Sequence, residues 1–266
     1  MVAQIQHVIV LMLENRSFDH MLGFLYPDKS QADFSGLQDL GQPFSNPSGS
    51  AEVAVSAGAP WVTWPDPPHE HSDVTMQLYG TTKPSEVYQA DKTPTMKGFV
   101  AAYQAAEEKF IADRAAAEEY GAPPDFRPVD GTGGGVMECF AIDTLPALHT
   151  LAREFAVCDN WFSSLPGPTW PNRFFAHCAT SDDRFNMALA DLIHPYDMET
   201  IFDHLEPNDR SWTIYYHDIL QSRTLRRLRD KEANFKLIYD FKSDVETNSL
   251  PTYSFIEPRY FDFLSQ

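Results

Sequence analysis

The sequence has 266 residues, a length that suits one α/β domain or two small domains. Its 20 basic and 38 acidic residues leave a net charge of −18 when the histidines are neutral, and such a surface repels the backbone of a nucleic acid. Hydrophobic residues make up 43% of the chain, which excludes global disorder. We therefore expect a folded protein whose partners do not include nucleic acid.

The cysteines and the N-terminal residues bear on the cellular compartment of the protein. Cys139, Cys158 and Cys178 are widely spaced and form no CxxC pair, which argues against a disulfide framework and a zinc–thiolate site, although one disulfide among them stays open. No apolar run approaches the roughly 20 residues that span a bilayer, and the first residues lack the features of a signal peptide. As written, the sequence predicts a cytoplasmic protein, or a secreted or periplasmic one if a leader is missing.

The first predicted element is an apolar strand at residues 8–13, of the kind that a parallel sheet buries on both faces. It ends in Glu14 and Asn15, and ligands of open α/β sheets bind at the carboxyl ends of strands. Residues 27–70 are rich in Gly, Pro, Ser and Asp and indicate an ordered loop or cap. An Ala- and Glu-rich stretch at 96–119 then predicts a long helix.

The later elements alternate between helices and strands. A glycine-rich segment at 131–135 lacks the Lys-Ser/Thr of a phosphate loop and predicts a turn. A helix is expected at 143–154 with Asp143 as its N-cap, followed by a short strand at 155–158. This alternation indicates an α/β fold with a mostly parallel sheet. The remaining predicted elements are helices near 198–205 and 224–231 and strands at 212–216 and 252–256.

The most informative segment for chemistry surrounds Thr169. Pro171 is predicted to open a helix with Thr169 just ahead of it, because proline is favoured in the first helical turn and threonine near the cap. The free N–H groups and the positive dipole end would attract an anion, most naturally a phosphate. Beside a divalent cation the Thr169 hydroxyl can attack phosphorus, and Asn172 and Arg173 can donate to phosphoryl oxygens. The alternative is a simple capped helix after a Pro-Gly turn.

Two long stretches resemble signatures of one enzyme family. Residues 7–23, HVIVLMLENRSFDHMLG, resemble the opening signature of the phosphoesterases that include non-specific and phosphatidylcholine-preferring phospholipases C and bacterial acid phosphatases. Residues 155–175, FAVCDNWFSSLPGPTWPNRFF, are similar to the second signature. Weaker similarity lies at 66–69, 96–99 and 254–260, in the order that the family shows.

The resemblance implies an alkaline-phosphatase-like, three-layer α/β/α fold with a mostly parallel sheet. It implies a single domain over residues 1–266 whose loop-rich, cap-like insertion runs from about 27 to 135. Members of the family continue after the segment at 254–260 with a His-Pro-Pro stretch and an Asp-Glu-His-Gly-Gly signature, and neither occurs here. We therefore expect the fold to be incomplete at the C-terminus, so that strands such as 8–13 expose apolar surface.

The resemblance also implies roles for individual residues. Glu14 and Asn15 match the metal-binding pair of the family, and Thr169 matches its nucleophile, which would also contact the metal. His69 matches an active-site histidine, and a histidine can protonate a departing alkoxide near neutral pH. Asn172 lies in the nucleophile motif and would help to hold the phosphoryl group. The expected cofactor is a divalent metal ion whose identity the sequence does not specify.

The implied activity is metal-dependent hydrolysis of phospholipid phosphodiesters, of the phospholipase C type, through a phospho-threonine intermediate. One alternative is an acid phosphatase that acts on phosphomonoesters. An alternative of another class is a truncated, non-catalytic protein that binds a phosphorylated ligand or a partner. The expected ligand is a phospholipid or a small phosphate ester, with peripheral membrane contact at most, because an acidic surface does not favour anionic lipids. The oligomeric state is left open.

Overall fold

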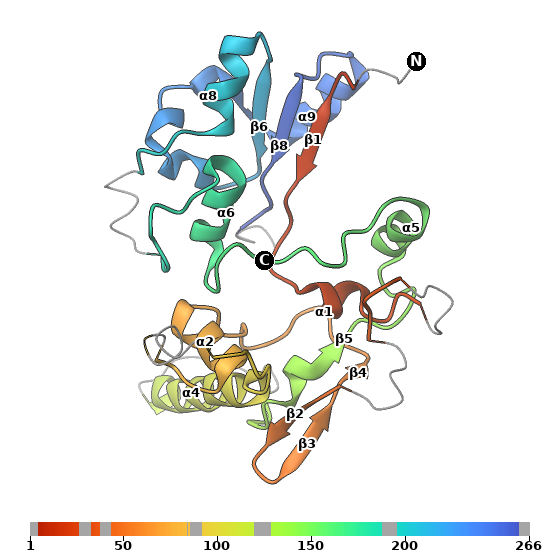
Figure 1. The fold of residues 1–266 in the computed structure, drawn as a ribbon, viewed down its shortest axis with the longest axis vertical. Coiled ribbons are helices and arrows are strands. Elements are labelled where there is room, and N and C mark those ends of the chain that lie inside the picture. The colour runs from red at the N-terminus through yellow and green to blue at the C-terminus, as the bar shows by residue number, and fades with distance from the viewer. Residues whose placement is uncertain are drawn as a thin grey trace. The chain divides into compact units, whose positions relative to one another are not determined.

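The computed structural model describes residues 5–26, 33–37, 44–83, 85, 92–119, 129–187 and 196–260. The chain forms two compact units, Met1–Asn15 with Pro168–Gln266, and Arg16–Gly167 (Figure 1). The chain thus leaves the first unit after residue 15 and returns to it at residue 168. The expectation of a single domain with an insertion at about 27–135 stays a prediction. Among the described residues, no helix is long and apolar enough to cross a membrane.

The first unit is built on a four-stranded sheet in the order β1-β8-β6-β7, in which every neighbouring pair is parallel. Figure 1 shows β8 between β1 and β6. In the register of this sheet, Phe255 lies opposite both Val10 and Ile214. The parallel sheet confirms the predicted α/β class and the strands expected at 212–216 and 252–256. The four strands are β1 (Val8–Leu11), β6 (Trp212–Tyr216), β7 (Phe235–Leu237) and β8 (Tyr253–Ile256).

Helices cover both faces of this sheet. Helices α6 (Thr169–Cys178) and α8 (Ile201–Leu205) pack on the face that carries Ile214, and α9 (Ile238–Glu246) contacts β6 and β7. Because side chains alternate along a strand, Tyr215 points to the opposite face, where its ring lies 5.1 Å from that of Phe241 on α9. The three layers confirm the predicted α/β/α arrangement. The buried core cluster comprises Phe174, Tyr196, Met198, Phe202, Trp212, Ile214, Leu225, Leu228 and Phe255.

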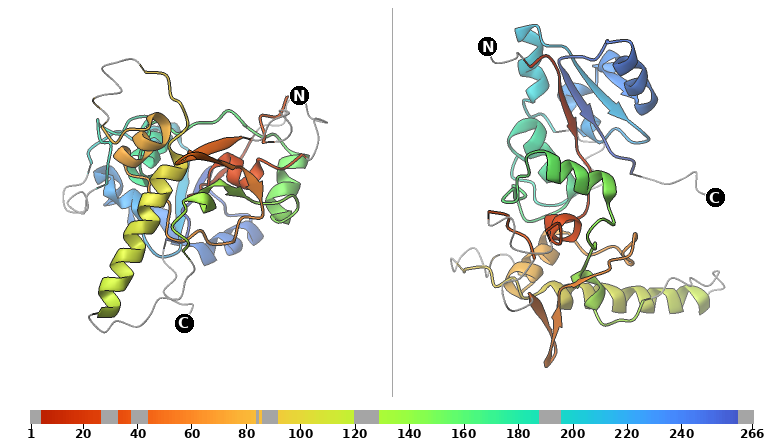
Figure 2. Two further views of the ribbon diagram at one scale, coloured as in Figure 1. Left: turned by 90° about the horizontal axis from the view of Figure 1, so that it is seen from below. Right: turned by 90° about the vertical axis from the view of Figure 1, so that its right-hand side faces the viewer.

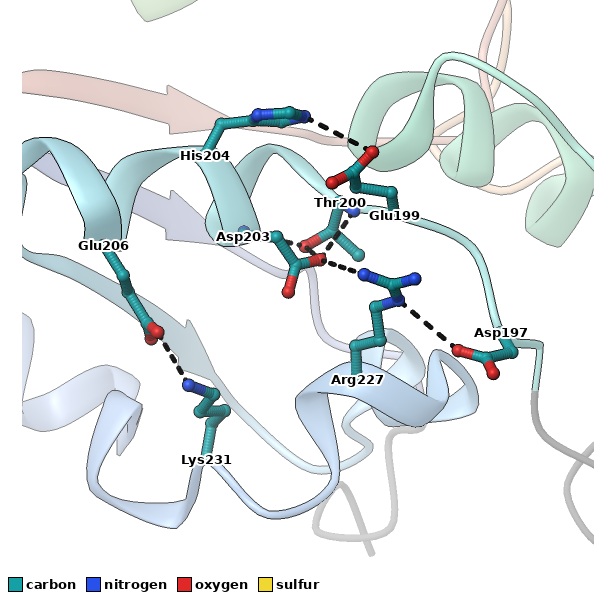
Figure 3. A network of polar contacts seen from close by, with 8 residues as sticks. All are labelled: Asp197, Glu199, Thr200, Asp203, His204, Glu206, Arg227 and Lys231. Atoms are coloured by element: carbon teal, nitrogen blue, oxygen red, sulfur yellow. Dashed lines mark hydrogen bonds and ion pairs between the residues drawn. The ribbon is translucent and has the colours of Figure 1, made fainter.

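Polar contacts fix the start of α8. Thr200 and Asp203 form a capping box, in which each side chain accepts a backbone N–H of the other residue. Arg227 then bridges two carboxylates, with Nε 3.3 Å from Asp197 Oδ1 and Nη1 3.9 Å from Asp203 Oδ2 (Figure 3). Two further pairs in this network join Lys231 to Glu206 at 2.7 Å and His204 to Glu199 at 3.9 Å.

The burial predicted for residues 8–13 is wrong. Val8, Ile9, Leu11 and Leu13 are 43%, 47%, 56% and 68% exposed. The reason is the position of β1, since it is the end strand of the described sheet and pairs with β8 alone. The expectation that this strand exposes apolar surface is therefore confirmed.

The second unit contains the longest helix, α4 (Phe99–Glu119), which begins three residues after the predicted start of the helix at 96–119 (Figure 2). The Gly-Ala-Pro-Pro sequence at 121–124, which would end such a helix, lies outside the described residues. The turn predicted at 131–135 is confirmed, with Gly133 at φ +71° and its N–H donating to Glu107 Oε2 at 2.6 Å. The other elements of this unit are α1 (Phe18–Leu22), β2 (Ser45–Ser48), β3 (Ala51–Ala54), β4 (Ser56–Ala57), α2 (His71–Tyr79), β5 (Glu138–Cys139) and α5 (Pro146–Glu154).

Three local predictions are wrong. Asp143 is not the N-cap of α5, because the helix begins at Pro146 and the Asp143 carboxylate instead accepts from Arg153 Nη1 at 2.8 Å. Residues 155–158 form no strand, since no described strand pairs with them and Phe155 is 71% exposed. The segment at 224–231 forms short 3-10 turns instead of an α-helix. All three cysteines are free thiols.

Candidate functional site

The first feature of the candidate site is the N-terminus of α6. The helix begins at Thr169, so Pro171 is its third residue, and the prediction that Pro171 opens the helix is wrong by two residues. Proline is tolerated there because the first-turn N–H groups have no intrahelical partner. Thr169 and Trp170 therefore present such N–H groups at the positive end of the helix dipole. The partly buried Thr169 brings its hydroxyl to the same end.

Asn172 holds the segment that leads into this helix. Its Nδ2 donates to the carbonyl oxygen of Pro168, one turn earlier, at 3.1 Å. This contact fixes the residue immediately before Thr169. The expected contact between Asn172 and a phosphoryl group stays a prediction.

Arg173 joins α6 to the end of β1. Its side chain is fully buried, and Nη2 donates to the Met12 carbonyl and to Glu14 Oε1, both at 3.2 Å. Nε and Nη1 are buried and have no hydrogen-bond partner among the described residues. The guanidinium also lies 5.5 Å from the centre of the Tyr260 ring, a contact that sequence reasoning did not find. The expected donation from Arg173 to a phosphoryl group stays a prediction, and the contacts in the structure are with the strand end.

Glu14 and Asn15 lie at the carboxyl end of β1. The Glu14 side chain is 23% exposed, and its one hydrogen bond to a described residue engages Oε1. Carboxylate, amide and hydroxyl oxygens suit a hard divalent cation, so Glu14, Asn15 and Thr169 fit such an ion in donor type. They are too few, because such a cation takes about six oxygens and the described chain contains no group of three or more His, Cys, Asp or Glu that could hold a metal. In donor type and number, these residues would fill only part of a coordination shell.

Glu257 follows β8 at the same edge of the sheet. It is fully buried, and its two oxygens accept the backbone N–H groups of Gln221 and Ser222, both at 3.0 Å. Burial raises the pKa of this carboxyl, and the hydrogen bonds and the charge of Arg173 oppose the rise. Both carboxylate oxygens accept backbone N–H groups, so the contacts of Glu257 in the structure are those of a structural residue.

His177 lies one turn after Arg173 and is 2% exposed. Its ring contacts those of Phe255 and Phe202, with centroids 4.6 and 5.6 Å away. Burial and, to a smaller extent, the charge of Arg173 lower the pKa of His177 to about 3. His177 is therefore a neutral residue that packs in the core.

His69 belongs to the second unit, where it precedes α2. Its Nδ1 lies 3.0 Å from the Pro67 carbonyl oxygen and 3.5 Å from Asp66 Oδ2, and the side chain is 46% exposed. Donation from Nδ1 to the carbonyl leaves Nε2 available for proton exchange with a ligand. Next to it, Glu70 and Asp73 form the capping box of α2, so Asp73 stabilises the start of this helix.

Other polar residues of the opening signature stabilise the second unit. Arg16 Nη1 donates to Thr63 Oγ1 at 2.5 Å and approaches His20 Nε2 at 3.5 Å. His20 packs edge-on against Phe140, and burial followed by the charge of Arg16 lowers the pKa of its imidazole. These contacts join Arg16 and His20 to Thr63 and Phe140 and thereby hold the segment that follows β1.

The Phosphoesterase family matches residues 5–263. "Non-specific phospholipase C1" of Arabidopsis thaliana is 33% identical over 262 residues, which cover 97% of this chain and 44% of that protein. "Non-specific phospholipase C6" of the same plant is 34% identical with the same coverage. "Phospholipase C B" of Mycobacterium tuberculosis is 26% identical over 287 residues, covering 96% of this chain and 50% of that protein. The chain thus spans about half the length of these relatives.

Proposed function

We propose, from the premise that this chain belongs to the Phosphoesterase family, that it provides the nucleophile of an enzyme that hydrolyses phospholipid phosphodiesters. One observation carries the proposal most directly. Thr169 is the first residue of α6, and Arg173 of the same helix hydrogen-bonds to Glu14 at the end of β1. The hydroxyl, the helix N–H groups and a carboxylate thus belong to one unit of the molecule.

The proposed reaction has two steps. The Thr169 hydroxyl loses its proton to solvent, its oxygen attacks phosphorus, and the bond from phosphorus to the substrate alcohol breaks, which leaves a phosphorylated Thr169. Water then attacks this phosphorus, one proton of that water returns to the Thr169 oxygen, and the phosphorylated head group is released. The N–H groups at the start of α6 stabilise the charge that develops on the phosphoryl oxygens. His69, whose Nδ1 lies 3.5 Å from Asp66 Oδ2, donates a proton to the departing alkoxide. In a phospholipase C reaction, the departing alcohol is diacylglycerol.

A divalent cation is part of the proposal. Some of its ligands would be oxygen atoms of Glu14, Asn15 and Thr169. The remaining ligands would come from other groups. When bound, the cation would lower the pKa of the threonine hydroxyl and neutralise phosphoryl charge. Arg173 engages Glu14 Oε1 and leaves the other carboxylate oxygen for this ion.

The relatives favour a phospholipid over a soluble phosphomonoester as the substrate. The plant and mycobacterial proteins are all named phospholipases C. The net charge of −18 disfavours anionic membrane surfaces, so a lipid with a neutral head group suits this chain better. We therefore propose phosphatidylcholine as the first substrate to test.

The proposal is tested by comparing Thr169→Ala and Thr169→Ser. Release of choline phosphate from phosphatidylcholine and of phosphate from p-nitrophenyl phosphate would be measured with and without divalent metal ions. We expect Thr169→Ala to lower kcat by about 10³-fold or more, because the attacking oxygen is lost. Thr169→Ser retains an oxygen and should keep much more activity. Full activity of Thr169→Ala would exclude the mechanism, and rapid release from the monoester alone would indicate a phosphatase.

A further inference from the structure

His71 is a buried histidine to which the proposed reaction gives no role. It is the first residue of α2 and is 8% exposed. Its Nδ1 lies 2.5 Å from the carbonyl oxygen of Pro166. Because a carbonyl oxygen can only accept a hydrogen bond, Nδ1 carries the proton and donates it. The imidazole therefore ties the start of α2 to the chain three residues before Thr169.

The stretch that contains Pro166 has no regular secondary structure of its own. All of residues 155–168 are described, and none belongs to a helix or strand between α5 and α6. Residues 161–164 are exposed, whereas Leu165 is 5% exposed. Irregular segments with few buried contacts open readily unless they are anchored. The bond from His71 thus falls where the chain passes from an exposed loop to the helix that begins with Thr169.

The backbone that carries His69 is itself anchored to two helices. The Tyr103 hydroxyl on α4 donates to the Pro65 carbonyl at 2.9 Å. Gln77 on α2 donates from Nε2 to the Pro68 carbonyl at 2.7 Å. The two helices contact each other (Figure 1). These bonds hold the backbone just before His69, and α2 continues it directly.

The same part of the second unit also holds the other connection of the chain. The chain passes between the two units after Asn15 and after Gly167. At the first passage, Arg16 donates from Nη1 to Thr63 Oγ1 at 2.5 Å and from Nη2 to the Trp61 carbonyl at 3.4 Å. At the second passage, the donor is the histidine that begins α2. One stretch of the second unit therefore anchors the chain at both passages.

We propose that His71 is a positioning residue for the reaction, which acts on Thr169 through its hydrogen bond to Pro166. This bond joins the segment that leads into the nucleophile to the segment that carries His69, the proposed proton donor. A misplacement of about 1 Å can slow an enzyme by about 100-fold, so loss of the bond should slow the chemical step. The inference rests on the proposed roles of Thr169 and His69.

The first test asks whether His71 holds the segment, and it uses the 266-residue chain without substrate. Nitrogen-15 relaxation gives backbone order parameters for Leu165 and Gly167, which are about 0.85 in rigid backbone and below about 0.6 in flexible backbone. We expect rigid values in the unsubstituted chain and flexible values in His71→Leu, which lacks the donor. His71→Asn should restore rigid values, because its Nδ2 can donate from near the place of the imidazole Nδ1. Rigid values in His71→Leu would overturn the inference, as would flexible values in the unsubstituted chain.

His149→Leu is the matched control. His149 is a histidine of the same unit that is 1% exposed, and its Nε2 lies 3.0 Å from the Met21 carbonyl oxygen. The substitution removes a comparable hydrogen bond, so it should lower stability and leave the order parameters of Leu165 and Gly167 unchanged. An equal fall in the control would overturn the specific role of His71. If circular dichroism shows that His71→Leu does not fold, His71→Gln takes its place, since the longer side chain carries its amide away from the Nδ1 position.

The second test separates positioning from folding. We expect His71→Leu to lower kcat for phosphatidylcholine about tenfold at unchanged KM, because the bond fixes the nucleophile and does not bind the substrate. His71→Asn should recover most of this loss. An unchanged kcat in a variant whose order parameters have fallen would overturn the inference. Full activity of Thr169→Ala would instead contradict the proposed function, and the order parameters, which involve no phosphate ester, distinguish the two failures.

Discussion

β1 and β8 are adjacent and parallel, and both contain large apolar residues, yet their surroundings differ. Phe255 and Ile256 of β8 are 1% and 7% exposed, whereas Ile9 and Leu11 of β1 are 47% and 56% exposed. β8 has a strand on each side, and β1 has one on a single side among the described residues. The comparison shows that the burial of a strand depends on its place in the sheet as much as on its own residues.

The glutamates that follow the two strands differ in the same way. Glu257 after β8 is fully buried, and both its oxygens accept backbone N–H groups. Glu14 after β1 is 23% exposed, and its hydrogen bond from Arg173 engages one oxygen. A carboxylate saturated by the backbone stabilises the fold, whereas a partly engaged one can bind a ligand. The same residue type at the same sheet edge can thus have different roles.

The largest predicted effect is the difference in stability loss between an alanine substitution in β8 and one in β1. Phe255→Ala should lower the free energy of unfolding by about 4 kcal/mol, because it leaves a cavity in the core. Leu11→Ala should lower it by about 1 kcal/mol or less, since more than half of that side chain is already exposed. Urea unfolding of both variants measures the difference. Equal losses would show that β1 is as well covered as β8.

The second prediction concerns His177, whose ring packs against Phe255 of β8. Burial lowers the pKa of His177 to about 3 in the folded chain, compared with 6.5 for an ordinary histidine, which is the value we take for the unfolded chain. Between pH 3 and pH 6.5 the unfolded chain therefore binds one more proton than the folded chain. The free energy of unfolding is therefore unaffected by His177 above pH 6.5. Below pH 6.5 it falls by about 1.4 kcal/mol per pH unit, because protonation of His177 favours the unfolded chain. From pH 6.5 to 4 the loss is about 3 kcal/mol.

Chemical denaturation as a function of pH tests this prediction, with His177→Phe as the control. The difference between the two proteins isolates His177 from carboxyl groups such as Glu257, which titrate in both. The variant should lack the part of the pH dependence that His177 causes. Equal pH profiles for the two proteins would show that His177 is not kept neutral by burial.

Much of the sheet could be predicted from local sequence. The strand at 212–216 matches β6, and the strand predicted at 252–256 begins one residue before β8, because both are short runs rich in aromatic and β-branched residues. β7 and α9 were missed, and the helix expected at 224–231 proved to be 3-10 turns. These elements depend on packing against distant strands, which a local pattern does not encode.

The candidate site was predictable in its residues but not in its contacts. Glu14 was expected at a strand end and Thr169 at a helix start, and both lie there. Arg173 was assigned to a phosphoryl group, whereas its hydrogen bonds reach Met12 and Glu14, about 160 residues away in sequence. Signatures specify which residues matter, but side-chain direction emerges only when α6 packs beside β1.

The third prediction compares the two strand-end glutamates directly. Glu257→Gln should lower the free energy of unfolding by about 2 kcal/mol, because one oxygen that accepts a backbone N–H becomes an NH₂ donor. Glu14→Gln should cost less than about 1 kcal/mol, since the side chain is partly exposed and Arg173 keeps its bond to the Met12 carbonyl. Thermal and urea unfolding measure both values. A larger loss for Glu14→Gln would assign that residue a mainly structural role.

The smallest predicted effect concerns carboxylates on the surface. Arg227→Ala removes the bridge between Asp197 and Asp203, but the arginine side chain is 42% exposed and Asp197 is 56% exposed (Figure 3). Solvent and salt screen such pairs, so we expect a loss of about 0.5 kcal/mol that shrinks further at high salt. Unfolding at low and high ionic strength measures it. If this loss equalled that of Glu257→Gln, burial would not distinguish structural carboxylates from the others, and the contrast between Glu257 and Glu14 would lose its physical basis.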